Sequence, residues 1–163
     1  MGYQKMIVAL GMLVCLNACT TVWNIQKNLR NPGQQLLDSP EEVWQQYDCG
    51  RMRLPFLAIE VNQLIPPRLR PGQEFNHRLT YAMCARESSE KIIGKLYTRI
   101  YLRGQLIVND VDASYAMRSG RWRVDTFIML PADVAIGMYS MELQFVSQRL
   151  KFRQHNSFVV EAH

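Results

Sequence analysis

The sequence lacks the short motifs by which many catalytic sites are recognised. It contains no G-x-S-x-G, no H-E-x-x-H and no glycine-rich phosphate-binding loop, so serine-hydrolase, zinc-protease and nucleotide-dependent chemistry have no support in the sequence. No C-x-x-C pair or Cys/His cluster is present, and a zinc site is therefore not predicted. We expect a protein that is not an enzyme and carries no cofactor.

The sequence also has no strong excess of positive or negative charge and no long apolar run. The 19 basic and 14 acidic residues give a net charge of +5, which is too mild a bias to indicate nucleic-acid binding. The longest apolar run, Met6 to Leu16, is shorter than the roughly 20 residues that cross a bilayer. We expect no nucleic-acid partner and no membrane-spanning segment.

What the N-terminus does contain is the pattern of a secretory signal. Lys5 supplies a positive charge, Met6 to Leu16 the apolar segment, and Ala18 a small residue at a cleavage site. The sequence Leu16-Asn17-Ala18-Cys19 resembles the lipobox of bacterial lipoproteins. The resemblance implies that residues 1–18 are removed and that Cys19 becomes a lipidated N-terminus. Without lipidation, the same pattern fits an ordinary secreted protein.

Lipidation would hold the mature chain of 145 residues on a membrane, because two or three acyl chains bind essentially permanently. Thr20 stands where an Asp would retain such a lipoprotein in the inner membrane, so the resemblance implies the periplasmic face of the outer membrane. The polar residues 19–37 include a Pro32-Gly33 breaker and show no sustained period, which predicts a tether.

Two further cysteines, Cys49 and Cys84, remain in the predicted mature chain. Disulfides persist in oxidising compartments, so these two side chains are candidates for a bridge. Two unpaired thiols are the alternative that the sequence leaves open.

Residues 38–50 have the pattern of a short helix. Ser39 and Glu42 are spaced as a capping box, Pro40 suits the first helical position, and Gly50 is the expected C-terminal cap. From residue 51 to 163 the apolar period changes to two, with turn signals at short and regular intervals. We predict an all-β fold, a single immunoglobulin-like β-sandwich of seven or eight antiparallel strands.

Two groups of short sequence motifs resemble those of a known family of domains. Arg70-Pro71-Gly72-Gln73-x-Phe75 opens a predicted strand, and Leu130-Pro131, Gly137-x-Tyr139 and Phe158-x-Val160 close the domain. They resemble immunoglobulin-like modules of the macroglobulin type over Leu54 to Glu161. The resemblance implies the fold only, because this chain has one module and no thioester region.

The last two predicted strands form a hairpin whose turn contains Ser147 and Gln148. The alternation of the sequence places Leu143 opposite Phe152 and leaves Glu142 on the solvent side.

Few residues are candidates for chemistry. His77 lies among apolar neighbours, which is typical of a hydrogen-bonded core histidine rather than a base; His155 and the terminal His163 belong to no motif. Asp110 and Asp112 are spaced to point the same way, either into a solvated turn or toward a cation. A deep pocket lined by His77 or by the two aspartates would favour an enzyme.

Clustered basic residues offer a binding surface or ordinary protection of sheet edges. As a surface they would contact an anionic glycan, a lipid or an acidic protein face. The residues concerned are Arg118, Arg121, Arg123, Arg149, Lys151 and Arg153.

These features together predict a lipoprotein of the outer membrane that acts as a non-enzymatic accessory or scaffold subunit of an envelope assembly, such as a secretion or pilus-type machine. Its partners would be the membrane, through the lipid, and a periplasmic protein. The alternative is a glycan- or lipopolysaccharide-binding module that uses the basic residues.

Overall fold

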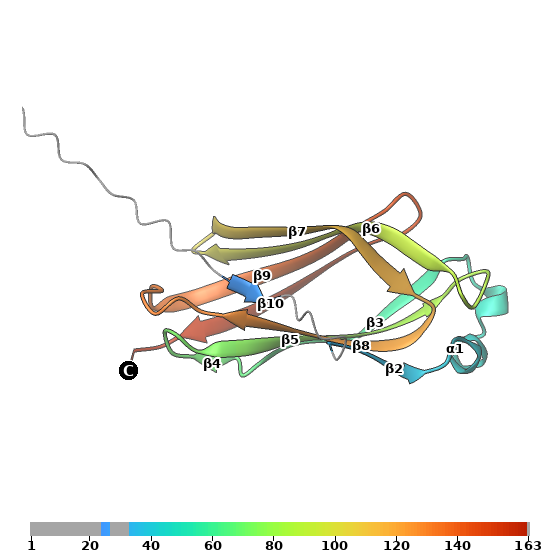
Figure 1. The fold of residues 1–163 in the computed structure, drawn as a ribbon, viewed down its shortest axis with the longest axis horizontal. Coiled ribbons are helices and arrows are strands. Elements are labelled where there is room, and N and C mark those ends of the chain that lie inside the picture. The colour runs from blue at the N-terminus through green and yellow to red at the C-terminus, as the bar shows by residue number, and fades with distance from the viewer. Residues whose placement is uncertain (1–23, 27–32, 163) are drawn as a thin grey trace, which may run out of the picture.

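The chain folds into two five-stranded sheets that pack face to face (Figure 1). The computed structural model describes residues 24–26 and 33–162. The first sheet contains β1 (Asn24–Gln26), β8 (Gly120–Met129), β5 (Glu74–Cys84) and β3 (Phe56–Ile65), in that order, with β2 (Gln34–Asp38) also paired to β8. The second contains β4 (Arg68–Leu69), β10 (Lys151–Val160), β9 (Gly137–Val146), β6 (Lys91–Leu102) and β7 (Gln105–Arg118). The predicted immunoglobulin-like β-sandwich is confirmed, but the described residues form ten strands rather than seven or eight, and β4 pairs with β10 in parallel.

The turns follow from local sequence. β6 and β7 are joined by Arg103 and Gly104, whose φ angles of 52° and 81° are those of a two-residue hairpin turn that matches the twist of the strands. The chain passes from one sheet to the other through residues 85–90 after β5, through Ser119 alone after β7, and through residues 130–136 after β8. In this arrangement β7 forms one edge of the second sheet.

The core consists of two apolar clusters, one toward each end of the sandwich. Phe75, Ile100 and Ile128 belong to the first cluster, together with residues of the 130–141 segment. Leu79, Met117 and Phe145 belong to the second. On β5 the residue between the two clusters is His77, which is also buried. The interior therefore changes from apolar to polar and back to apolar along the strands.

Helix α1 (Pro40–Gln46) begins as the sequence predicts. The Ser39 hydroxyl accepts a hydrogen bond from the Glu42 backbone N–H at 3.2 Å, and the Glu42 carboxylate accepts one from the Ser39 N–H at 2.7 Å. The helix ends earlier than expected, because Asp48 adopts a left-handed conformation with φ 49°. Asx residues tolerate this conformation, so Gly50 is not the cap and lies within a 3-10 helix, Cys49–Arg51.

The predicted tether is wrong for part of its length. β1 and β2 lie within residues 19–37 or just beyond, and both pair antiparallel with β8, with Asn24 opposite Met129 and Gln34 opposite Val124. An edge strand can be held by the backbone hydrogen bonds to its one partner, without burying a row of apolar side chains. These short polar strands therefore show no alternation of apolar and polar residues in the sequence. The sandwich therefore begins well before residue 51. No helix among the described residues is long and apolar enough to span a bilayer.

The hairpin of β9 and β10 differs from the prediction by two residues. Phe152 lies opposite Phe145, and Gln154 lies opposite Leu143, because the turn is longer than the two residues assumed, closing with a hydrogen bond from the Ser147 N–H to the Leu150 carbonyl at 2.9 Å. A shift of two preserves which face each side chain occupies. Glu142 nevertheless differs from expectation, since only 6% of it is exposed.

Candidate functional site

A band of polar side chains crosses the interior between the two apolar clusters. On the first sheet, His77 of β5 lies opposite Thr126 of β8. On the second sheet, Thr98 of β6 lies opposite Asp110 of β7. The inward-pointing residues on either side of His77, Thr126 and Thr98 along their strands belong to the two apolar clusters. The sandwich therefore has polar groups at a level of its interior where packing alone would favour aliphatic side chains.

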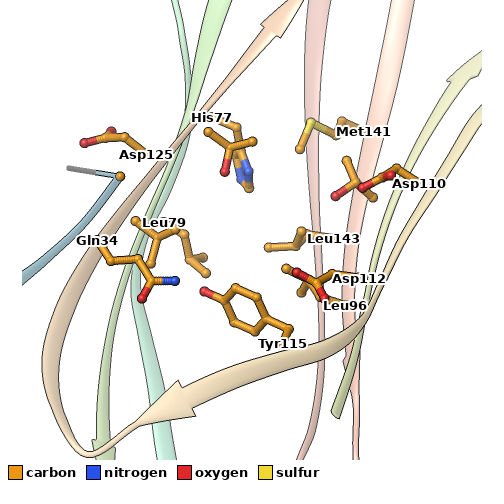
Figure 2. Close-up of a pocket in the computed structure, with 14 residues that line it drawn as sticks. Gln34, His77, Leu79, Leu96, Asp110, Asp112, Tyr115, Asp125, Met141 and Leu143 are labelled. Carbon is orange, nitrogen blue, oxygen red and sulfur yellow. The ribbon is translucent and has the colours of Figure 1, made fainter. Parts of the chain in front are cut away.

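A cavity of about 240 Å³ lies within this band. Figure 2 shows His77, Tyr115, Asp110 and Asp112 around it, with Gln34 on the side of β2. The apolar part of its wall is formed by Leu79, Leu96, Val124, Met141 and Leu143. His77 and the two aspartates, which the sequence offers as separate candidates, therefore line one cavity.

His77 is fixed at the back of the cavity by two asparagines. Its Nε2 lies 2.8 Å from the Asn62 Oδ1, which also accepts a hydrogen bond from the Asn156 Nδ2 at 2.8 Å. With that oxygen as acceptor, Nε2 carries the proton and Nδ1 is left as an acceptor. Burial lowers the pKa of His77 to about 4, against the smaller opposing effect of the Asp125 charge, so the imidazole is neutral at pH 7.

The carboxylates around the cavity differ in their surroundings. The Asp112 Oδ1 accepts a hydrogen bond from the Ser114 N–H at 3.1 Å, and its side chain points into the cavity (Figure 2). Asp125 points away from it (Figure 2). Burial alone would raise the pKa of Asp125, but hydrogen bonds from Arg78 and Asn76 hold it below its usual range.

The six basic residues expected to form a surface do not come together. Arg121 and Arg123 alternate along β8 with core residues, so they lie on the outer face of the first sheet. Lys151 and Arg153 alternate with Phe152 of the core on β10, which places them on the outer face of the second sheet. The two groups occupy opposite faces of the molecule.

Five of these six side chains are already engaged. Arg121 forms ion pairs with Asp38 and Glu60, and its side chain is only 17% exposed. The remaining contacts join Arg118 to the Trp122 ring, Arg123 to Asp125, Arg149 to Glu90, and Arg153 to Glu142. These guanidinium groups serve the fold, and little free positive charge is left for a partner.

An acidic centre on the outer face of the second sheet was not expected from the sequence. The Glu142 carboxylate accepts a hydrogen bond from the Arg99 Nη1 at 2.5 Å. The Arg153 Nε and the His155 Nε2 lie 3.6 and 3.8 Å from its other oxygen. The flanking basic residues cover Glu142, and only the pairing of β6, β9 and β10 brings them together.

The cysteines behave as one of the two alternatives predicted. Cys49 and Cys84 form a disulfide that connects the 3-10 helix to the end of β5. Cys19 and His163 lie outside the described residues. The sequence also contains one Ser-x-x-Lys pair, Ser88 and Lys91, but only Ser88 lines the shallow cavity beside α1.

The edge strand β7 is a second candidate site. It is 14 residues long, and among the described residues its one pairing partner is β6. Leu106, Ile107 and Val111 are between 37% and 47% exposed along it. Strands of this length that expose apolar side chains at an edge invite pairing with another chain.

These features define the protein as a single immunoglobulin-like β-sandwich with an interior polar cavity and an open strand edge. No protein-family model matches the chain, and no curated protein matches it. Among solved structures, the sporulation control protein Spo0M of Bacillus subtilis is 12% identical, with a TM-score of 0.43 over 66% of this chain and 50% of that protein.

Two other solved structures have a similar arrangement of strands. A CARDB domain from Pyrococcus furiosus is 16% identical, with a TM-score of 0.42 over 67% of this chain and 89% of that domain. An alkylpurine DNA glycosylase of Pseudomonas fluorescens is 12% identical, with a TM-score of 0.46 over 73% of this chain and 33% of the enzyme. The chain thus spans half or less of Spo0M and the glycosylase, and no activity is transferred from them.

Proposed function

We propose that the protein is a lipoprotein of the outer membrane that acts as a non-enzymatic scaffold subunit of a periplasmic assembly. The lipid at Cys19 would hold the sandwich at the inner leaflet of the outer membrane, and β7 would dock a partner protein. The observation that carries the proposal is the long edge of β7, which has a single pairing partner in the part of the chain that the structure describes.

The docking mode that fits this edge is the addition of a strand. An extended segment of a partner would pair with the backbone of β7, and its alternate side chains would contact Ile107 and Val111. The backbone hydrogen bonds would supply affinity and the apolar contacts would supply selectivity. Register irregularities after Gly94 and Ile100 bend the β6–β7 pair, which disfavours pairing with chance partners.

The anchor and the disulfide support the same location. The lipobox-like sequence ends at Cys19, and the Cys49–Cys84 bridge belongs in an oxidising compartment such as the periplasm. The alternative, an anionic glycan or lipopolysaccharide as partner, receives less support because five of the six basic side chains have contacts within the fold.

The test is a crosslinking pull-down from intact envelopes with four forms of the full chain. They are the wild type, Cys19→Ala, the double variant Ile107→Lys/Val111→Lys, and Met138→Lys. Met138 is the matched control, because it is 68% exposed and lies on β9, away from the β7 edge. Lysine on an edge strand opposes pairing with a further strand.

We expect the wild type and Met138→Lys to retain the same defined envelope proteins. Cys19→Ala and the β7 double variant should each lose them by at least tenfold in yield. If the β7 variant retains its partners, docking at this edge is wrong. If the wild type retains no defined partner, the scaffold proposal itself fails.

A further inference from the structure

Two side chains of the polar band, Thr98 and His77, each have a polar atom without a hydrogen-bond partner among the described residues. Thr98 is only 7% exposed, and its hydroxyl makes no hydrogen bond among the described residues. His77 is 4% exposed and uses its Nε2 for Asn62, which leaves Nδ1 without a partner in the same part of the chain. Neither atom is among the fully buried polar atoms that lack a partner, so each reaches the space of the cavity rather than being enclosed by protein.

These groups lie on the wall of the cavity, so the missing partner belongs inside it. Thr98 projects from β6 and His77 from β5, on opposite sheets. The Tyr115 hydroxyl points into the same space (Figure 2). A molecule in the cavity would therefore contact both sheets and complete hydrogen bonds that the protein begins.

The charge and the hydrogen-bonding character of the wall define what this molecule must be. The carboxylate of Asp112 is an acceptor only, and the neutral His77 presents an acceptor at Nδ1. Among the described residues that line the cavity there is no basic side chain. The wall therefore selects a donor-rich cation and disfavours an anion.

The rest of the wall and the size of the space narrow the class further. Aliphatic side chains, among them Leu79, Leu96 and Leu143, cover the surface between the polar groups. A volume of about 240 Å³ lies below the roughly 300–1,000 Å³ of drug-sized pockets. Among the residues that the structure describes, no three His, Cys, Asp or Glu side chains converge as metal ligands. A short organic cation fits these conditions better than a metal ion.

We infer that the interior cavity binds a small alkylammonium ligand. Its ammonium group lies beside Asp112 and Thr98, and its aliphatic chain packs against Leu79 and Leu143. The site uses inward-pointing side chains of β7, whereas strand docking would use the backbone edge of β7 with Ile107 and Val111, so the two proposals rest on different groups. Asp112 holds the charge and Thr98 the hydrogen bond, while His77 offers the acceptor on the opposite sheet.

The test compares two probes that share an alkyl chain. The full-length chain, purified in a neutral detergent, is titrated with pentylammonium chloride and with 1-pentanol, and binding is followed by calorimetry. We expect pentylammonium to bind at least tenfold more tightly than the alcohol. Equal affinities, or no saturable binding of either probe because the cavity holds only water, would overturn the inference.

Two variants with a matched control locate the binding. Asp112→Asn removes the charge and Thr98→Val removes the hydroxyl, and each should weaken pentylammonium about tenfold. Asp133→Asn makes the same chemical change at an exposed loop position that does not line the cavity, and it should leave the affinity unchanged. An unchanged affinity in Asp112→Asn would contradict the site even if the wild type binds. The two probes on wild-type protein keep the test decisive if a variant fails to fold.

Discussion

At the scale of single residues, His77 shows how burial and one hydrogen bond determine a protonation state. The imidazole has little contact with solvent, and its Nε2 is held by the Asn62 carbonyl oxygen. Its pKa of about 4 lies below the ordinary value of 6.5. Folding therefore disfavours the protonated form.

This shift has a defined consequence for stability. The unfolded chain binds a proton at His77 as the pH falls through 6.5, whereas the folded chain does so only near pH 4. The stability contributed by neutral His77 is thus complete above pH 6.5 and is lost as the pH falls toward 4. By linkage, the difference amounts to about 3 kcal/mol.

The prediction is tested with His77→Gln, which removes the titrating group. Urea unfolding at pH 7 and pH 4.5 should show a smaller loss of unfolding free energy in the variant than in the wild type. His155→Gln is the control, since 62% of the His155 side chain is exposed. A variant whose unfolding free energy falls as steeply as that of the wild type would show that His77 does not titrate in this way.

Glu142 shows that alternation along one strand predicts the face of the sheet on which a side chain lies but not how deeply that side chain is buried. Its position on β9 places it on the outer face, as the sequence indicates. The sequence does not show that Arg99, forty-three positions earlier, and Arg153 would cover it. The burial of Glu142 depends on side chains of the neighbouring strands. Which strands are neighbours is determined by the whole sheet and not by the sequence of one strand.

At the scale of elements, the strongly patterned segments were predictable and the weakly patterned ones were not. β5 and β8 carry alternating apolar residues, and α1 carries a capping box, so each is identified from its own sequence. β1 and β2 are short and largely polar, and only the exposed edge of β8 makes them strands. The two-residue shift in the β9–β10 hairpin arises from the turn, which no side-chain period specifies.

The same distinction applies to the candidate site. His77, Asp110 and Asp112 were identifiable as chemistry-bearing residues, but their separation in the sequence gave no reason to place them in one cavity. Thr98 and Tyr115 carry no sequence signal at all, because a threonine or a tyrosine is common in any strand. The pairing of β6 with β7 and the packing of the two sheets bring these side chains together.

The disulfide ties α1 and the 3-10 helix to the sheet. Cys49 and Cys84 are separated by 35 positions, and closing a loop of this length stabilises a protein by about 2–4 kcal/mol through the unfolded state. The double variant Cys49→Ala/Cys84→Ala should lose that amount of unfolding free energy in urea. Reductant should destabilise the wild type and leave the variant unchanged. A wild type that is insensitive to reductant under unfolding conditions would contradict the bridge.

At the scale of the whole molecule, β1 restricts how the proposed lipoprotein sits on its membrane. Asn24 is paired with Met129 at the end of β8, only five positions after Cys19. Five residues span at most about 17 Å. If Cys19 is lipidated, the sandwich is therefore held close to the leaflet rather than on a long tether, with the 130–137 loop toward the lipid.

An exposed apolar residue at this end agrees with that orientation. Ile136 is 56% exposed and lies in the 130–136 connection that follows β8. Apolar side chains at an interface gain from contact with the lipid boundary. Ile93 is also 56% exposed, but it lies near the start of β6, opposite Ala116 at the far end of the sandwich.

The orientation is tested by introducing a tryptophan at each of these two isoleucine positions. In vesicles that contain brominated phospholipid, Ile136→Trp should add a fluorescence component that the lipid quenches. Ile93→Trp should add one that is not quenched, although both positions are equally exposed. Adding Cys19→Ala should abolish the difference, because the protein would no longer be held at the bilayer. Equal quenching of the two tryptophans in the lipidated protein would mean that the 130–137 end does not face the membrane, and β7 would then have to be approached from a different side.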